Sequence, residues 1–196
     1  MGRKEKLAFW VNLYNTIVVD GIVTLGIKQS VQEIPGFFRK VAYTIGSYAF
    51  SADDIEHGIL RGNVRLWRYP LQPFRPGDRR RGLVITPVYH RIHFALVCGS
   101  RSCSPIDYYD SEQIDDQLEE AARSFVNASE VLILPEEGKV LLSEIFRWYE
   151  RDFGGRSGVI DFIFDYLADE KARSFLRKNA KNITFEYLHY DWNLNR

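Results

Sequence analysis

The fold of this chain is decided by residues 7–26, which read LAFWVNLYNTIVVDGIVTLG. Apolar side chains fall on almost every side of a helix drawn through this run, which is typical of a helix buried in a core. Gly26 supplies the left-handed residue that commonly ends a helix. The sequence therefore predicts a central buried helix over Lys6–Leu25.

Neither a transmembrane segment nor a secretion signal is predicted from this run. Its length approaches the roughly 20 residues that span a bilayer. However, Asn12, Asn15 and Asp20 would lie at costly depths in lipid. No small-residue cleavage site follows the run. No helix cap precedes Lys6, so we expect the natural domain to begin before residue 1.

The composition favours one soluble, cytoplasmic domain over residues 1–196. That length is usual for a single domain, and 45% hydrophobic residues can form a sizeable core. The 26 basic and 26 acidic residues cancel, which argues against a nucleic-acid binder. The two cysteines, Cys98 and Cys103, are too few for a secreted scaffold held by disulfides.

Helical and strand patterns through the rest of the chain predict an α+β fold. Core motifs occupy residues 6–127, and a C-terminal extension with helices and a last strand occupies residues 128–196. The predicted strands are Lys40–Ile45, Ser47–Phe50, Arg91–Cys98, Val131–Leu134, Lys139–Leu142 and Ile183–His189. The later predicted helices are Ser51–Leu60, one that begins at Asp110 or Ser111, one that begins at Ser143, Gly158–Leu167 and Glu170–Lys178. We expect the first helix to pack on a small, mostly antiparallel sheet with the other helices around it.

The stretch with the most potentially reactive side chains is His93–Cys103. A buried strand carries His93 and ends at Cys98, and a loop of small polar residues then leads to Cys103. A nest of backbone N–H groups that binds an anion could form there from Gly99, Ser100, Arg101 and Ser102. A nest beside a thiol and an imidazole has the makeup of an acyl-transfer site.

Strand geometry favours Cys103 as the nucleophile of such a site. Side chains alternate between the two faces of a strand, so His93 and Cys98 would point apart. A bend at Gly99 could return Cys103 toward His93. Cys98 is then interpreted as a core residue, because free cysteines commonly pack as small hydrophobic groups. The spacing of the two cysteines also differs from the C-x₂-C pair of common zinc sites, so no metal is expected.

The helix Ser51–Leu60 offers His57 as a second candidate base. Asp53, His57 and Arg61 follow one another at a spacing of four, so Asp53 could orient the imidazole as a triad carboxylate does. Glu56 suits the positive end of the helix. We assign binding roles to Asp53, Glu56 and Arg61; the alternative is an ordinary solvated helix face.

Asn12 and Asn15 share one side of the first helix. Asn15 could orient a histidine, as an asparagine does in papain-type sites, and Asn12 could bind beside it. The favoured alternative is that both amides hold neighbouring loops in place.

Arginines are concentrated between Arg61 and Arg101, where nine of them accompany a single acid, Asp78. This local basic bias could bind an anionic ligand or an acidic protein partner. The alternative is a solvated loop that the acidic residues of Glu112–Glu120 balance. The loop itself, Asn63–Tyr89, is long enough to be functional or mobile.

Six motifs together resemble the family of domains of unknown function numbered five-four-seven. The resemblance covers nearly the whole chain, and residues 63–89 carry no signature of the family. The motifs are Leu7–Asn15 (LAFWVNLYN), Asp54–Arg61 (DIEHGILR), His93–Cys103 (HFALVCGSRSC), Glu120–Phe125, Ile145–Tyr149 and Tyr190–Asn195.

The resemblance implies a fold akin to papain and transglutaminases, with the first helix at its centre. Such enzymes carry the nucleophilic cysteine at the start of that helix, and this chain has none there. The resemblance therefore implies a degenerate or rearranged site, in which His93 and the Cys98–Cys103 loop take the place of the usual catalytic residues. Some relatives are fused to glutaredoxin-like or DEP-type modules, and plant relatives can lack the thiols.

Three functions stay open at this point. The first is a hydrolase or transferase without a cofactor, with Cys103 as nucleophile and His93 or His57 as base. The second is a non-catalytic interaction or regulatory domain that binds a protein or peptide through the arginine-rich loop. The third is a thiol–disulfide redox module, although the cysteine spacing is not C-x-x-C.

Overall fold

The computed structural model describes residues 1–65, 71–180 and 183–195. Its α-helices are α1 (Arg3–Thr24), α2 (Phe37–Lys40), α3 (Ile114–Val126), α4 (Glu144–Trp148), α5 (Arg156–Tyr166) and α6 (Glu170–Asn179). Its strands are β1 (Ala42–Ile45), β2 (Tyr48–Ser51), β3 (Val131–Leu134), β4 (Lys139–Leu142) and β5 (Phe185–Tyr187). Short helices of other types are η1 (Val31–Glu33), η2 (Asp54–Leu60), η3 (Arg79–Leu83), η4 (His90–Phe94), η5 (Pro135–Glu137) and η6 (Glu150–Phe153). With about 50% helix and 11% strand, the α+β class is confirmed.

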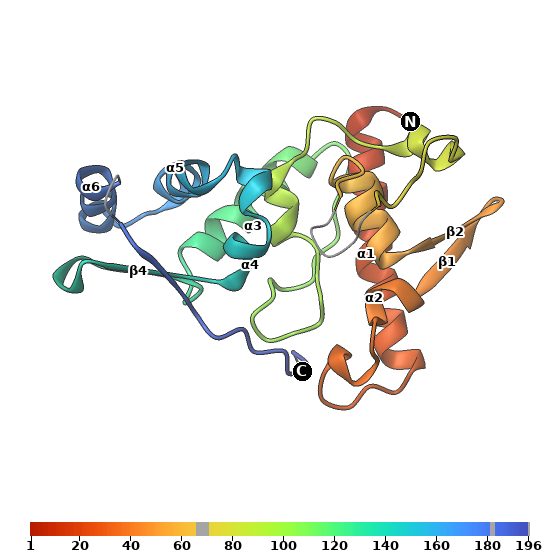
Figure 1. The fold of residues 1–196 in the computed structure, drawn as a ribbon, viewed down its shortest axis with the longest axis horizontal. Coiled ribbons are helices and arrows are strands. Elements are labelled where there is room, and N and C mark those ends of the chain that lie inside the picture. Colours follow the sequence, from red (N-terminus) through yellow and green to blue (C-terminus); the bar gives the residue numbers. More distant parts are fainter. Residues whose placement is uncertain (66–70, 181–182, 196) are drawn as a thin grey trace.

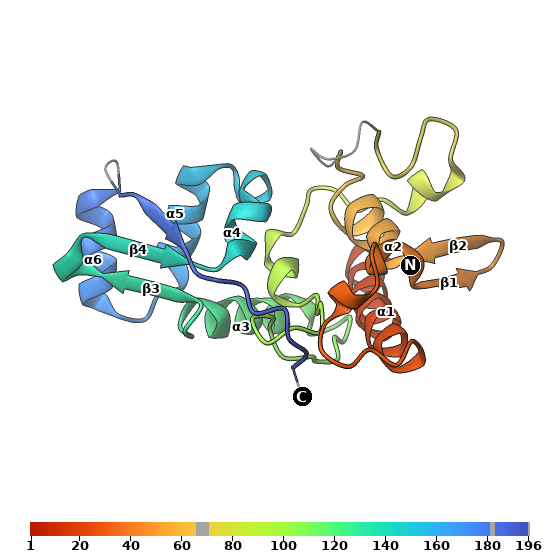
Figure 2. The ribbon, with the colours of Figure 1, turned by 60° about the horizontal axis from the view of Figure 1, so that its bottom comes forward.

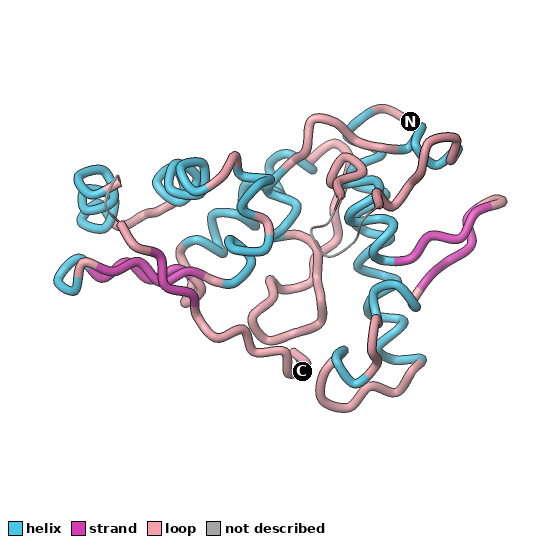
Figure 3. Tube along the Cα trace, viewed as in Figure 1, coloured by secondary structure: helices cyan, strands magenta, loops and turns pink. Residues whose placement is uncertain are grey.

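Two small sheets lie at opposite ends of the molecule, with helices and long loops between them (Figures 1, 2 and 3). The first is the antiparallel hairpin of β1 and β2. In the second, β3 pairs antiparallel with β4, and β4 pairs parallel with β5. The two predicted hairpins are confirmed, and the predicted last strand is shortened to Phe185–Tyr187.

The predicted first helix is confirmed as α1, and Gly26 follows it in the left-handed region with φ of 62°. One side of α1 is buried, whereas Val23 on the other side is 72% exposed. The main helical partners of α1 are η2 and α3. It also packs on the β1–β2 hairpin, where the Trp10 and Phe50 rings lie 5.0 Å apart and the Tyr43 hydroxyl donates to Asp20 at 2.8 Å. By length and composition α1 could cross a membrane, and half of its apolar window is buried inside the protein.

The helical turn that leads into η2 begins at a reciprocal cap, as the sequence predicts. The Ser51 hydroxyl accepts from the Asp54 amide, and the Asp54 carboxylate accepts from the Ser51 amide, both at 3.1 Å. Wide π-type turns follow, in which the Arg61 amide donates to the Glu56 carbonyl. Such turns are rare and occur frequently at functional sites. They leave both Glu56 and Arg61 buried.

The predicted strand Arg91–Cys98 is wrong. Residues His90–Phe94 form the short helix η4, in which the Ile92 carbonyl accepts from the amides of Ala95 and Leu96. A short apolar run fits a buried strand and a buried helical turn equally well, so its pattern did not distinguish them. The strand alternation that separated His93 from Cys98 therefore does not apply.

The predicted cap of α3 is also wrong. Asp110 accepts from the amide of Glu112 in a turn, and α3 begins only at Ile114, without a side-chain cap. In the predicted loop Asn63–Tyr89, η3 interrupts the irregular chain. Residues 66–70 of that loop, including Arg68, lie outside the described residues.

Buried apolar residues form two clusters, which meet near η4 and α3. The first contains α1, η2 and the N-terminal half of α3, and the second contains the C-terminal half of α3, both strands of the β3–β4 hairpin, and α5. Ile92 belongs to the first cluster and Phe94 to the second, and Trp192 packs against both. His93 therefore lies at the junction of the two clusters. The single-domain organisation stays a prediction.

Candidate functional site

The two thiols lie side by side in the loop after η4. Gly99, with φ of 78°, turns the chain back after Cys98. The Cys98 amide then donates to the Cys103 sulfur at 3.1 Å, and the Cys103 thiol donates to the Leu96 carbonyl at 3.5 Å. If the Cys103 thiol turns toward an ionised Cys98, the same proton stabilises that anion and lowers the pKa of Cys98. Both cysteines are unoxidised and partly exposed. The loop thus forms a dithiol pair that strand geometry did not predict.

Cys98 is the more acidic thiol of the pair. Its sulfur lies beside Cys103, 3.0 Å from the Ser100 hydroxyl and 3.1 Å from the Tyr190 hydroxyl. These donors outweigh burial and lower the pKa of Cys98 to about 6. The neighbouring Cys98 and burial raise the pKa of the Cys103 thiol well above its ordinary value. At neutral pH the pair therefore holds one thiolate and one thiol.

The C-terminal segment closes over the thiol loop. The amides of Arg101 and Ser102 donate to the carbonyls of Asn193 and Asp191, at 2.9 and 3.4 Å. The Cys103 amide donates to Ser100 within the loop. These N–H groups have partners inside the protein, so they do not form the predicted anion-binding nest.

Gly99 lies where a side chain has no room. A Cβ there would meet Ile22 Cδ1 of α1 at 2.5 Å, in addition to the backbone strain of a positive φ. We expect Gly99→Ala to lower the free energy of unfolding by about 3 kcal/mol, from strain and overpacking together. Gly138→Ala is the matched control, because Gly138 has φ of 67° and open space around it. Equal losses in chemical denaturation of the two variants would contradict a close contact at Gly99.

A second group of polar side chains is buried beside the thiol loop, and Glu56 is at its centre. The hydroxyl of Tyr149 donates to one carboxylate oxygen of Glu56 at 2.7 Å, and that of Tyr14 donates to the other at 3.2 Å. Burial alone would raise the pKa of Glu56, but His57, Arg61 and the Tyr149 hydroxyl lower it below its ordinary value. Glu56 is therefore a buried carboxylate.

Arg61 and Asp152 form the buried ion pair of this group. Arg61 Nε and Nη2 donate to the two Asp152 oxygens at 2.5 and 3.1 Å, a bidentate arrangement. His93 Nε2 donates to the same carboxylate at 2.9 Å. Burial would raise the pKa of Asp152, but these two partners hold it well below its usual range. Burial lowers the pKa of His93, so its ring is neutral at neutral pH.

His57 occupies the edge of this group. Arg61 Nη1 donates to His57 Nδ1 at 2.8 Å, so the ring nitrogen that faces Asp53 is Nε2. That nitrogen lies 3.9 Å from an Asp53 oxygen, beyond hydrogen-bond distance. The predicted orientation of His57 by Asp53 is therefore not formed, and Arg61 takes that role.

Tyrosines connect the ionic group to the thiol loop. The His93 ring stacks on the Tyr149 ring, with centroids 3.8 Å apart. Burial raises the pKa of Tyr14 and Tyr149, and the negative charges of Glu56 and Cys98 add to that rise. No hydrogen bond joins His57 or His93 to either sulfur within the described residues. The structure thus places imidazoles and thiols in one region without a thiol–imidazole pair.

The two asparagines of α1 hold the backbone around this region. The Asn15 amide donates to the Ala95 carbonyl and accepts from the Val97 amide, both at 3.0 Å. The Asn12 amide donates to the Tyr109 carbonyl at 2.7 Å and accepts from the Tyr109 amide at 2.9 Å. Both ends of each amide are therefore occupied by backbone, which favours the loop-holding role over the orientation of a histidine.

Sequence reasoning missed Asp152, Tyr14, Tyr149 and Tyr190 as parts of the site. Tyr149 and Tyr190 occur in motifs of the resemblance, so their position there was the available signal. Asp152 had no such signal, because it comes from η6, far along the chain from Arg61. Within the described residues, His, Cys, Asp and Glu form no group of three or more that could hold a metal ion.

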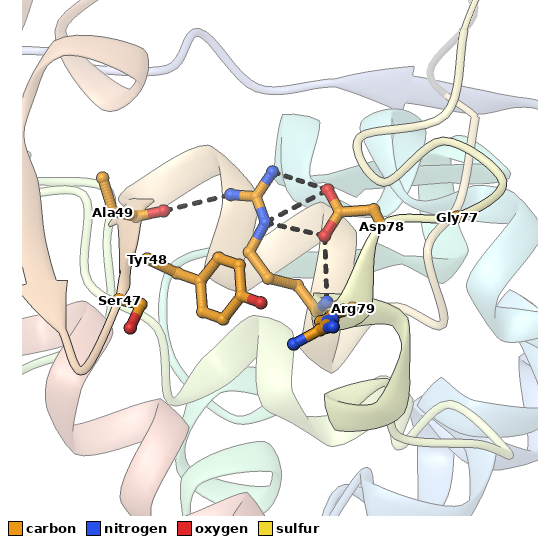
Figure 4. A pocket seen from close by; sticks show the side chains of 7 residues that line it. Ser47, Tyr48, Ala49, Gly77, Asp78 and Arg79 are labelled. Atoms are coloured by element: carbon orange, nitrogen blue, oxygen red, sulfur yellow. Dashed lines mark hydrogen bonds and ion pairs between the residues drawn. The ribbon is translucent and has the colours of Figure 1, made fainter.

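Two hollows open on the surface, one beside the thiol loop and one at the β1–β2 hairpin. One of about 420 Å³ has Cys103, Ser100 and Gly99 in its wall, with apolar side chains of α1 opposite. The other, of about 590 Å³, lies between the β1–β2 turn and residues 77–80 (Figure 4). There Arg80 is held by Asp78 at 2.8 Å and by the Ala49 carbonyl at 3.0 Å.

The family assignment follows from a comparison with family models. The model of the protein family of unknown function DUF547 matches residues 1–126, which is more than half of the chain. The chain therefore belongs to this family. Cys98, Cys103, Glu56 and His93 lie within the matched part, whereas Tyr149, Asp152 and Tyr190 lie beyond it. No curated protein and no solved structure matches the chain.

Proposed function

We propose that this chain is a thiol redox domain, in which Cys98 is the reactive thiolate and Cys103 is the resolving thiol. The observation that carries this proposal is that the loop brings the two cysteines together, with the Cys98 amide donating to the Cys103 sulfur at 3.1 Å. The pKa values of the two thiols are shifted in opposite directions. A thiolate at neutral pH beside a protonated thiol is the arrangement that thiol–disulfide chemistry needs.

The chemistry balances with hydrogen peroxide as oxidant. The Cys98 thiolate attacks the terminal oxygen, the O–O bond breaks, and hydroxide leaves with a proton from solvent as water. Cys98 is then a sulfenic acid. The Cys103 sulfur attacks the Cys98 sulfur, the S–O bond breaks, and a second water leaves as the disulfide forms. A dithiol or glutathione-type reductant restores both thiols by exchange.

Oxidation with one equivalent of hydrogen peroxide at pH 7 tests this proposal. We expect an intramolecular Cys98–Cys103 disulfide, seen as the loss of two hydrogen atoms in the intact mass and as one bridged peptide after digestion. Cys98→Ser is the control, because it removes the thiolate and keeps a group of similar size. Recovery of both free thiols after peroxide treatment would sink the proposal.

A thiol hydrolase or transferase is the second candidate, and the observation that favours it is the buried His93–Asp152 pair close to an acidic thiol. In this candidate, Cys98 replaces Cys103 as the proposed nucleophile, because Cys98 is the more acidic thiol. A rotation of His93 away from Asp152 would be needed before it could act as base. A stable acyl adduct on Cys98 after incubation with an activated ester, absent in His93→Asn, would favour this candidate over redox chemistry.

An interaction domain is the third candidate, and the hollow of Figure 4 favours it. Asp78 and Asp54 neutralise Arg80, whereas Arg79 and Arg81 are exposed. An acidic peptide is the ligand whose charge suits this surface. Pull-down partners that survive in an Arg79→Ala/Arg81→Ala variant would exclude binding through these arginines.

A further inference from the structure

The last described segment, residues 190–195, crosses back from β5 to the middle of the molecule (Figure 2). Ser100 and Leu194 form an antiparallel bridge, and the Asn195 amide donates to the Gly99 carbonyl at 2.9 Å. The Leu194 amide donates to Gln29, in the turn that follows α1. The segment therefore ties the thiol loop to the end of α1.

One side-chain contact couples this segment to the state of Cys98. Tyr190 has a single hydroxyl proton, and it lies 3.1 Å from the Cys98 sulfur and 3.1 Å from the Ser100 oxygen. With a thiolate at Cys98, Tyr190 donates to the sulfur, and the Ser100 hydroxyl is within hydrogen-bond distance of both the sulfur and the Tyr190 oxygen. A hydrogen bond to a charged acceptor is about twice as strong as one between neutral groups. The contact is therefore strong while Cys98 is reduced.

We infer that residues 190–195 form a strap that holds the thiol loop in the reduced protein and is released when Cys98 and Cys103 form a disulfide. The inference rests on the proposed redox function. Disulfide formation removes the negative charge that Tyr190 contacts and draws the Cys98 sulfur to Cys103. The Tyr190 contact then weakens, and with it the backbone pairing of residues 191–195 with the loop.

Release of the strap changes the hollow beside Cys103. Leu194 and Asn195 form part of its wall, together with apolar side chains of α1. Leu194 is buried there, whereas Val19 and Val23 of α1 are already partly exposed. Departure of Leu194 exposes more apolar surface at the thiol loop. Oxidation of the two cysteines thus also increases the apolar surface that is exposed beside the thiol loop.

Amide hydrogen exchange of the whole chain, read by mass spectrometry, tests the strap. We expect exchange in residues 190–195 to become about 10-fold faster in the peroxide-oxidised protein, from the loss of one charge-assisted hydrogen bond. Peptides from α6 should not change. Cys98→Ser treated with the same peroxide controls for oxidation elsewhere. Reduced Tyr190→Phe should show faster exchange in the strap without any oxidant.

The outcomes separate the two proposals. A disulfide with faster exchange of the strap supports both. A disulfide with unchanged exchange overturns the strap and leaves the redox function standing. Absence of a disulfide overturns both proposals. Unchanged exchange in reduced Tyr190→Phe overturns the strap by itself, because the coupling depends on that hydroxyl.

Discussion

Asp152→Ala is expected to lower the free energy of unfolding by about 3–5 kcal/mol, the usual cost of leaving a buried charge without its partner. Arg61 is 5% exposed and donates two hydrogen bonds to Asp152, and His93 donates a third to the same carboxylate. Without Asp152, the Arg61 charge loses its hydrogen-bonded carboxylate and keeps Glu56, the His57 ring and the Tyr149 ring near it. The contact between η2 and η6 weakens as a result.

Urea denaturation at pH 7 measures this loss. Asp165→Ala is the matched control, because Asp165 is an exposed carboxylate on α5, and we expect a change within about 0.5 kcal/mol there. The double variant Arg61→Met/Asp152→Leu removes both charges and should cost less than Asp152→Ala alone. A loss under about 1 kcal/mol in Asp152→Ala would show that this pair is not desolvated as the structure has it.

Cys103→Ala is expected to slow the alkylation of Cys98 by iodoacetamide at pH 6 by roughly 100-fold, toward the behaviour of an unperturbed thiol with a pKa of about 8.5. The thiol of Cys103 is the largest cause of the lowered pKa of Cys98, ahead of Ser100 and Tyr190. Its loss leaves the Cys98 anion with fewer donors. Because only the thiolate reacts, the rate at low pH falls as the pKa rises.

Ser104→Ala is the control for this effect. Ser104 neighbours Cys103, but its hydroxyl has no hydrogen-bond partner among the described residues. We expect the alkylation rate of Cys98 to be unchanged in that variant. An equal rate in Cys103→Ala and in the unaltered protein would show that Cys103 does not stabilise the thiolate.

Local signals in the sequence predicted much of the fold. The Ser51–Asp54 cap, the turns at Gly46 and Gly138, and the end of α1 at Gly26 depend on a few neighbouring residues, and all of them are present. Local residues did not predict the structure of the segment around His93. Its apolar residues fit strand and helix equally, and the amide of Val97 is satisfied by Asn15, which is distant in the sequence.

The sequence predicted several residues of the candidate site, but it did not predict which side chains they contact. His93, Glu56, Arg61 and the two cysteines do lie in one region, but their partners come from elsewhere. Asp152 approaches from η6 and Tyr190 from the C-terminal segment. Contacts between such distant segments depend on tertiary packing, which no local pattern encodes. The choice of Cys103 over Cys98 followed directly from the incorrect strand.

We infer that Cys98 is a thiolate at neutral pH because hydrogen bonds from Cys103, Ser100 and Tyr190 stabilise its anion. The most direct measurement is the rate of iodoacetamide alkylation at each cysteine of the reduced protein between pH 5 and 9, resolved by peptide mapping. A lowered pKa means that the reactive anion is present above the shifted value and is lost as the pH falls through it. We expect the rate at Cys98 to reach half its plateau near pH 6, with Cys103 unreactive across the range. A half-point for Cys98 at about pH 8.5, the value of an ordinary thiol, would contradict the account.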